Sequence, residues 1–323
     1  CKRLHGGPFL HLVQEKPPKL RFRERKDVEK MKRSARKIRK KRMRRLLFWL
    51  LLILLVLLLV WPRRVRPNDL VSPEAILMDD SGEVVAEKNA DTQIYPASMT
   101  KMMTVLLALE NGPSLDQSVT LPEDIFPSLQ EQGASMAGFQ PGETATIQDL
   151  LYGAMLPSGA ECCEALAREV SGSEEAFVAL MNQKAAELGM TSTHFCNPTG
   201  LHDPEHVSTV RDMALLLRAA LQNETFRTLL SAQRYTVQPT NLHPEGFTMT
   251  STFWKELDGT TLRNGTILGG KTGYTSSAGL CLASAAQIKG KTYFLVTAGA
   301  QGNHETEPDH IEDAVNVYRQ LAR

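Results

Sequence analysis

The sequence predicts an α/β domain whose sheet is assembled from both ends of the chain. Residues 75–80 begin with an apolar run typical of a strand, and residues 83–87 alternate as a second strand after the turn signal Ser81-Gly82. Near the other end, the apolar runs 278–285 and 292–298 are typical of buried strands, and a Lys-Gly-Lys turn joins them. Helical patterns occupy the stretch between these two pairs, so helices are expected to pack against the sheet.

Hydroxyl side chains mark the expected helix starts in this middle stretch. Thr146 and Ser173 each precede a helical pattern, and Ser208 or Thr209 begins a third. The periodicity after Ser173 places its apolar side chains on one face. A last helix is predicted over 311–321 and closes the domain.

Charge divides the 323 residues unevenly. Residues 1–45 hold about 19 of the 37 Lys and Arg against about 4 of the 36 Asp and Glu. Residues 67–323 carry about 15 basic against 32 acidic side chains, a net charge of roughly −17. This acidic body does not favour nucleic-acid binding, and none is expected. We predict a basic arm over 1–45, an apolar helix over 46–61, a linker over 62–72 and one domain over 73–323.

The apolar segment 46–61 is predicted to span a membrane once. Its sixteen apolar residues cover about 24 Å as a helix, slightly short of the ~30 Å hydrocarbon core. Flanking arginines can reach the interface, and Trp49 and Trp61 suit it. The positive charge before the segment predicts a cytoplasmic N-terminus and an extracytoplasmic domain. The alternative is a cleaved signal peptide, although a 45-residue polar front and an exit at Pro62-Arg63 are unusual for one.

The candidate nucleophile lies in the stretch 96–110, where Ser98 precedes Lys101 by three residues. On a helix this spacing puts both side chains on one face, so Lys101 can take the proton of Ser98 if its pKa is lowered. The apolar run 102–109 predicts such a lowered pKa, because burial disfavours the charged form of lysine. The spacing alone also occurs between ordinary polar side chains.

Two later elements complete a pattern. Ser158 stands at a helix break in Leu156-Pro157-Ser158-Gly159-Ala160, and the run Gly270-Lys271-Thr272-Gly273-Tyr274 marks the edge of a glycine-flanked strand. With Ser98 and Lys101, and in this order, they resemble the S-x-x-K, S-x-N and K-T-G elements of penicillin-recognising serine acyl transferases. The resemblance implies a penicillin-binding/β-lactamase-like domain, with a mainly antiparallel sheet flanked by helices and a helical subdomain.

The sequence between these elements indicates one group within this class of enzymes. Residues 197–201, 206–214 and 271–282 are similar to the low-molecular-weight D-alanyl-D-alanine carboxypeptidases, and the likeness covers about 73–323. It implies a peptidase that trims pentapeptide stems of peptidoglycan, binds β-lactams covalently, and needs no metal or organic cofactor.

The resemblance also implies a role for each site residue. Ser98 would attack the carbonyl between the two terminal D-alanines, with Lys101 as its base. The backbone N–H groups of Ser98 and Tyr274 would form the oxyanion hole, and Ser158 would pass a proton to the leaving amine. The substrate-binding set would be Lys271, Thr272, Gly273, Tyr274 and His310.

Two departures from the family pattern bear on activity. Ala160 stands where the family has asparagine, and the neighbouring Glu161 is the candidate substitute for the missing amide. His310 stands where relatives carry an arginine that holds the substrate carboxylate. Three alternatives therefore remain: a D,D-endopeptidase using the same residues, a class A-like β-lactamase, for which the deacylating-glutamate loop is not evident, and a catalytically silent wall-binding protein.

Overall fold

A computed structural model of the protein describes residues 22–60, 69–257, 259–303 and 305–323. The chain divides into two units, Cys1–Pro62 and Arg63–Arg323. The first contains α1 (Phe22–Val60), which includes residues 46–60 of the predicted spanning segment, while Trp61 and residues 62–68 of the linker lie outside the described residues. Within the described residues, none of the helices combines the length and the apolar character needed to cross a membrane.

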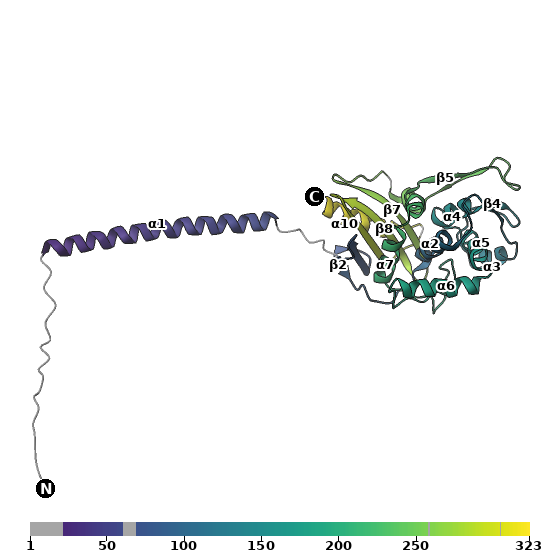
Figure 1. The fold of residues 1–323 in the computed structure, drawn as a ribbon, viewed down its shortest axis with the longest axis horizontal. Coiled ribbons are helices and arrows are strands. Elements are labelled where there is room, and N and C mark those ends of the chain that lie inside the picture. Colours follow the sequence, from purple (N-terminus) through teal and green to yellow (C-terminus); the bar gives the residue numbers. More distant parts are fainter. Residues whose placement is uncertain (1–21, 61–68, 258, 304) are drawn as a thin grey trace, which may run out of the picture. The chain divides into compact units, whose positions relative to one another are not determined.

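The second unit is built on a five-stranded antiparallel sheet in the order β2-β1-β9-β8-β7 (Figure 1). The N-terminal strands β1 (Glu74–Asp79) and β2 (Val84–Lys88) form a hairpin, as predicted. β1 then pairs with β9 (Lys291–Ala300), which pairs with β8 (Gly279–Ile288). β7 (Gly265–Thr275) completes the sheet beside β8. The prediction of a sheet drawn from both ends of the chain is confirmed.

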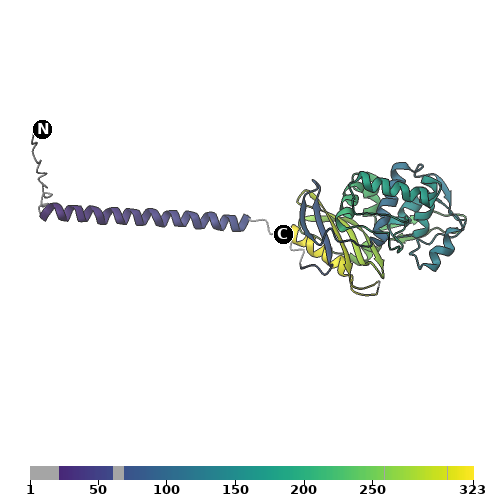
Figure 2. The same cartoon turned by 90° about the horizontal axis from the view of Figure 1, so that it is seen from below.

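Helices cover both faces of this sheet (Figure 2). α10 (Asp309–Ala322) packs on the face that carries Leu77 and Leu295. The opposite face carries Ile76 and Val296, which belong to the larger core together with α2 (Lys101–Asn111) and α7 (Val210–Ala220). Successive residues of β1 therefore enter different cores, because side chains alternate along a strand.

The helical middle of the chain forms the subdomain beside the sheet. Thr146 caps α4 through a reciprocal bond with Asp149, and Ser173 and Thr209 cap α6 and α7, so these three predicted starts are confirmed. The helices of this region are α3 (Ile125–Glu131), α4 (Ile147–Met155), α5 (Ala160–Ser171), α6 (Glu174–Glu187) and α8 (Glu224–Ser231).

Short elements escaped prediction. Their three to eight residues are too few for a hydrophobic period to stand out from loop sequence. They include α3, α8, the strands β3 (Ser118–Thr120) and β4 (Thr144–Thr146), the hairpin of β5 (Arg234–Val237) with β6 (Phe247–Thr250), and α9 (Thr252–Leu257).

Candidate active site

Ser98 and Lys101 meet at the start of α2. Ser98 lies on the 3-10 turn η2 (Ala97–Thr100), and Lys101 is the first residue of α2. Lys101 Nζ lies 2.9 Å from Ser98 Oγ. The three-residue spacing thus brings an amine and a hydroxyl within proton-transfer distance, as predicted.

Burial sets the protonation of Lys101. Its side chain is 2% exposed, and desolvation lowers its pKa from the ordinary value, partly offset by the nearby Cys163 and Glu161. Lys101 Nζ donates to the Thr199 carbonyl at 2.6 Å, which fixes the amine beneath Ser98. Asn197 in turn shapes this loop, because its Oδ1 accepts from the backbone N–H groups of Thr199 and Gly200.

His206 supports the turn that carries Ser98. The backbone N–H of Cys196 donates to His206 Nδ1 at 3.0 Å, so the ring proton lies on Nε2 and points to Thr100 Oγ1 at 2.8 Å. Burial lowers the pKa of His206 to about 4. The ring is therefore neutral near pH 7 and acts as a fixed bridge between η2 and the loop around residue 196.

A second serine and lysine pair lies across the site. Lys271 Nζ, from β7, donates to Ser158 Oγ at 2.9 Å and to the Thr272 carbonyl at 2.9 Å. Lys271 is 1% exposed, and burial, together with Lys101, lowers its pKa well below the ordinary value. Ser158 occupies the break between α4 and α5 with φ 68°, a left-handed backbone conformation that costs energy for a residue other than glycine.

β7 approaches the Ser98 turn closely at Gly273. A Cβ placed on Gly273 would lie 3.1 Å from the backbone nitrogen of Ser98 and 3.2 Å from Ala97 Cβ. Ala97 itself has φ 47°, so strained backbone precedes the serine. This close contact brings the N-terminal end of α2 and the Tyr274 end of β7 together, as an oxyanion hole made from both would require.

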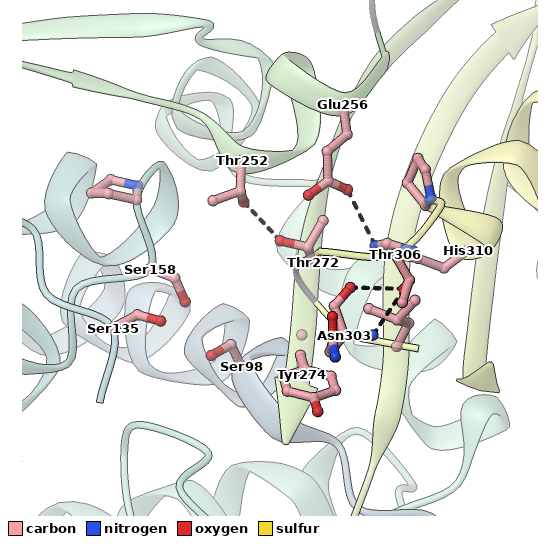
Figure 3. Close-up of a pocket in the computed structure, with 14 residues that line it drawn as sticks. Ser98, Ser135, Ser158, Thr252, Glu256, Thr272, Tyr274, Asn303, Thr306 and His310 are labelled. Carbon is pink, nitrogen blue, oxygen red and sulfur yellow. Dashed lines mark hydrogen bonds and ion pairs between the residues drawn. The ribbon is translucent and has the colours of Figure 1, made fainter. Parts of the chain in front are cut away.

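The predicted residues surround one cavity of about 130 Å³ (Figure 3). Ser98 and Ser158 face β7 across it, and Thr272 Oγ1 lies 2.7 Å from Thr252 Oγ1 at the β7 side. Lys101 and Lys271 are buried and contact the two serines without lining this cavity. The predicted residues that line the cavity are Ser98, Ser158, Thr272, Gly273, Tyr274 and His310.

His310 lies at the end of this cavity away from Ser158, in the first turn of α10 (Figure 3). Its side chain is 3% exposed, and its Nε2 lies 3.4 Å from Glu256 Oε2 on α9. Burial raises the pKa of Glu256. An imidazole that can carry positive charge therefore occupies the place where the resemblance put a carboxylate-binding group.

A second, larger cavity of about 510 Å³ also reaches Ser98. It extends from Lys101 and Ala160 towards Leu201 and Ser276. Ser98 thus stands at the junction of a small cavity and a larger one. A peptide bond bound across Ser98 would place one of its sides in each.

The expectation for Glu161 is wrong. Its carboxylate is fully buried, and Oε1 accepts from the backbone N–H groups of Ala137 at 2.7 Å and Gly138 at 3.0 Å. Glu161 therefore fixes the loop over the site and does not replace an amide at Ala160. Ala160 itself lines the larger cavity.

Other residues at the site have no recognisable pattern in the sequence. Ser135, Thr252 and Glu256 line the small cavity, but each stands alone in loop or short-helix sequence. Thr199 acts through its carbonyl, which any residue supplies. Only their position in the fold identifies them.

Comparison with known proteins shows which family this chain is similar to. The family described as D-alanyl-D-alanine carboxypeptidase matches residues 62–302. The carboxypeptidase DacF of Bacillus subtilis is 35% identical over 237 residues, 70% of this chain, and this chain spans 57% of the length of DacF. A D-alanyl-D-alanine endopeptidase of Pseudomonas aeruginosa is 32% identical over 259 residues, 78% of each chain.

A solved structure shares the fold. The crystal structure of the Streptomyces K15 DD-transpeptidase is matched with a TM-score of 0.69 and 27% identity, over 78% of this chain and 97% of that one.

Proposed function

Because this chain belongs to the D-alanyl-D-alanine carboxypeptidase family, we propose that it is a serine D,D-carboxypeptidase that removes the terminal D-alanine from peptidoglycan pentapeptide stems. The observation that carries the proposal is the pair of Ser98 and Lys101, with oxygen and nitrogen 2.9 Å apart and the amine buried. Burial lowers the pKa of the Lys101 amine, and an amine of lowered pKa is a better-suited base for a serine hydroxyl.

Acylation would begin at Ser98. As its Oγ attacks the carbonyl carbon between the two D-alanines, Lys101 Nζ takes the hydroxyl proton. The negative charge that develops on the carbonyl oxygen would be stabilised by the backbone N–H groups of Ser98 and Tyr274, which the close contact at Gly273 holds near each other.

The leaving D-alanine would depart through the small cavity. Ser158 would relay a proton: its hydroxyl donates to the leaving nitrogen, which takes the electrons of the broken C–N bond, and Lys271 Nζ, which donates a hydrogen bond to Ser158 Oγ, would return a proton to the serine oxygen. Water would next attack the ester on Ser98 and release the shortened stem. A β-lactam would form the same ester and so label Ser98.

The size of the small cavity supports a single-residue leaving group. Its volume of about 130 Å³ is close to that of a cavity that accommodates benzene, which has as many non-hydrogen atoms as alanine. His310 at its end, together with the Thr272 hydroxyl, is suited to the terminal carboxylate. This is the feature that favours a carboxypeptidase over an endopeptidase, whose leaving group is a larger stem.

The proposal is tested by incubating residues 67–323 with a fluorescent penicillin, a D-Ala-D-Ala-terminated peptide and a cross-linked stem dimer. We expect covalent labelling and D-alanine release, with slower cleavage of the dimer. Labelling without release of D-alanine would indicate a penicillin-binding protein of other activity, and faster cleavage of the dimer would favour the endopeptidase.

The His310 role predicts a pH dependence for the peptide reaction. Protonated imidazole can form a charge-assisted hydrogen bond, worth about 1.5–3 kcal/mol, with the terminal carboxylate. We expect kcat/KM for D-alanine release to fall roughly ten- to hundredfold as His310 loses its proton. In His310→Arg, kcat/KM for D-alanine release should no longer fall over this pH range. With an ester substrate that lacks the carboxylate, the wild type and His310→Arg should have the same pH dependence. Identical profiles for the two proteins would exclude the role.

We also propose that residues 46–61 anchor the enzyme in a membrane, with the N-terminus in the cytoplasm and the catalytic domain outside. The support is the run of sixteen apolar residues after an arm with a net charge of roughly +15. Membrane fractionation and protease protection of the full chain test it. Release of a protein cleaved near Trp61 would favour the signal peptide.

A further inference from the structure

An acidic cavity of about 300 Å³ lies beside the larger of the two cavities at Ser98. It is formed by α3, α5, the start of α6 and the loop 197–203; α3, α5 and α6 lie together in Figure 1. Four residues line both this cavity and the larger one at Ser98, so the two cavities adjoin. They are Gln132, Thr199, Leu201 and His202.

Glu164 on α5 is the buried carboxyl group of this cavity. Its side chain lines the cavity, yet the residue is only 7% exposed. Within the part of the chain that the structure describes, its carboxylate makes no hydrogen bond and no ion pair. Burial raises the pKa of Glu164 to about 8, and the negative charge of the neighbouring Glu174 makes a smaller contribution in the same direction. A buried carboxylate without a partner is costly, and a bound cation would remove that cost.

The protein supplies little positive charge to Glu164. Arg168 also lines the cavity, but its guanidinium donates two hydrogen bonds to Asp124, at 2.9 and 2.8 Å. Glu174 adds a second carboxylate, whose pKa burial also raises. Among the described residues, no group of three or more acidic, His or Cys side chains is arranged to hold a metal ion. The chemistry therefore suits an organic ammonium group, which needs one strong acceptor and offers three donors.

We propose that this cavity is a subsite for a primary ammonium group on a side chain of the acyl part of the substrate, with Glu164 as its acceptor. The inference rests on the proposed function, because the peptide must lie across Ser98 with its acyl part in the larger cavity. The ammonium would enter past Thr199 and Leu201 and form a charge-assisted hydrogen bond with the Glu164 carboxylate. The enzyme would thus select stems that carry a free side-chain amine.

Three peptides test the subsite on the full chain. They are acetyl-L-Lys-D-Ala-D-Ala, its Nε-acetylated form, and the norleucine analogue, which keeps the aliphatic stem without the amine. We expect kcat/KM for D-alanine release to be at least about tenfold higher for the lysyl peptide than for the other two. Glu164→Gln should remove this preference, and Glu174→Gln should reduce it. Glu175→Gln, an exposed neighbour outside the cavity lining, should retain it.

The ratio between peptides is the readout, because a change at Glu164 also alters the electrostatics of Lys101 and so affects all three peptides alike. Equal kcat/KM for the three peptides in the wild type, or a preference that survives Glu164→Gln in a folded protein, would overturn the subsite. n-Butylamine should compete with the lysyl peptide alone; binding of butylamine without any difference between peptides would indicate a site for free amines and also overturn it.

Failure of the proposed function would look different. If no peptide releases D-alanine although penicillin labels Ser98, the carboxypeptidase assignment fails. The same three peptides would then be compared as competitors of penicillin labelling. Stronger protection by the lysyl peptide, lost in Glu164→Gln, would still support the subsite, and equal protection would refute it.

Discussion

Ser98 and Ser158 line the same small cavity, and each lies 2.9 Å from a lysine amine, Ser98 from Lys101 and Ser158 from Lys271. They differ in surroundings. Ser98 lines both cavities and stands beside backbone N–H groups of η2 and β7, whereas Ser158 is 6% exposed and lines the small cavity but not the larger one. A short distance between a serine and a lysine therefore does not by itself identify the nucleophile. Access for the substrate and donors for the oxyanion distinguish the two serines.

The largest expected effect separates the serines. Ser98→Ala should abolish covalent penicillin labelling, because it removes the attacking oxygen that lies 2.9 Å from Lys101 Nζ. Ser158→Ala should slow labelling but leave it measurable, since the attacking oxygen remains. Mass spectrometry of the labelled protein measures both. Thermal unfolding is the control for the fold, and labelling that persists in Ser98→Ala would assign the nucleophile to another residue.

A smaller effect separates the roles of the lysines. Lys101→Ala should slow acylation by about 10²–10⁴-fold, the usual loss when a positioned base is removed. The wild-type rate should fall with falling pH as Lys101 gains its proton, and burial places this limb below the ordinary lysine pKa of 10.5. Stopped-flow acylation across pH measures it. Lys271→Ala should acylate more slowly than the wild type, but its acylation rate should still fall with falling pH as Lys101 gains its proton. If this pH dependence is lost in Lys271→Ala, Lys271 is the base.

A third test alters the contact that only Ser98 has. Gly273→Ala places a methyl group 3.1 Å from the Ser98 nitrogen, so β7 and η2 must separate by a few tenths of an ångström. We expect about a tenfold or greater loss in acylation rate, because oxyanion donors act only when correctly placed. Gly290→Ala in the β8–β9 turn, at φ 82°, is the contrasting variant. It should cost stability through backbone strain while acylation stays unchanged.

The last test measures stability instead of acylation, and it concerns the support of the Ser98 turn by His206. Its pKa is about 4 in the folded protein against an ordinary 6.5, so the unfolded chain binds the proton first as pH falls. Stability should therefore be complete above about pH 6.5 and decline towards pH 4, by about 3 kcal/mol in total. Denaturant unfolding across this range measures it. In His206→Gln the free energy of unfolding should depend less on pH, whereas the change at the exposed His194, His194→Gln, should leave the pH dependence as in the wild type. An equal pH dependence in the wild type and both variants would show that His206 is not its source.

The two pairs also show what sequence reasoning can reach. Ser98 and Lys101 are three residues apart, so helical geometry alone predicted their contact. Ser158 and Lys271 are 113 residues apart, and only the likeness to a family joined them before the structure was known. The strands and the helix caps were also predicted from short-range patterns, namely apolar runs or alternation for the strands and a hydroxyl residue before a helical pattern for the caps.

What could not be predicted depends on distant contacts. Glu161 follows the Ser158 motif directly, yet its carboxylate turns to the backbone of Ala137 and Gly138. Glu164 and Glu256 belong to no motif, and their importance comes from burial beside cavities that several distant segments form together. Charge and periodicity in the sequence do not indicate which carboxyl groups the tertiary fold buries.

The order of the sheet has a consequence for the timing of synthesis. β1 pairs with β9, so the second strand partner of Glu74–Asp79 is made more than two hundred residues later. At roughly 5–20 residues per second, a ribosome needs about 10–40 seconds to make the intervening chain. During that interval Ser98 and Lys101 already exist, but the strand that brings Lys271 and the Tyr274 backbone does not. The newborn chain therefore stays chemically silent until its last strands are added, and a product cut short before β7 cannot form the ester.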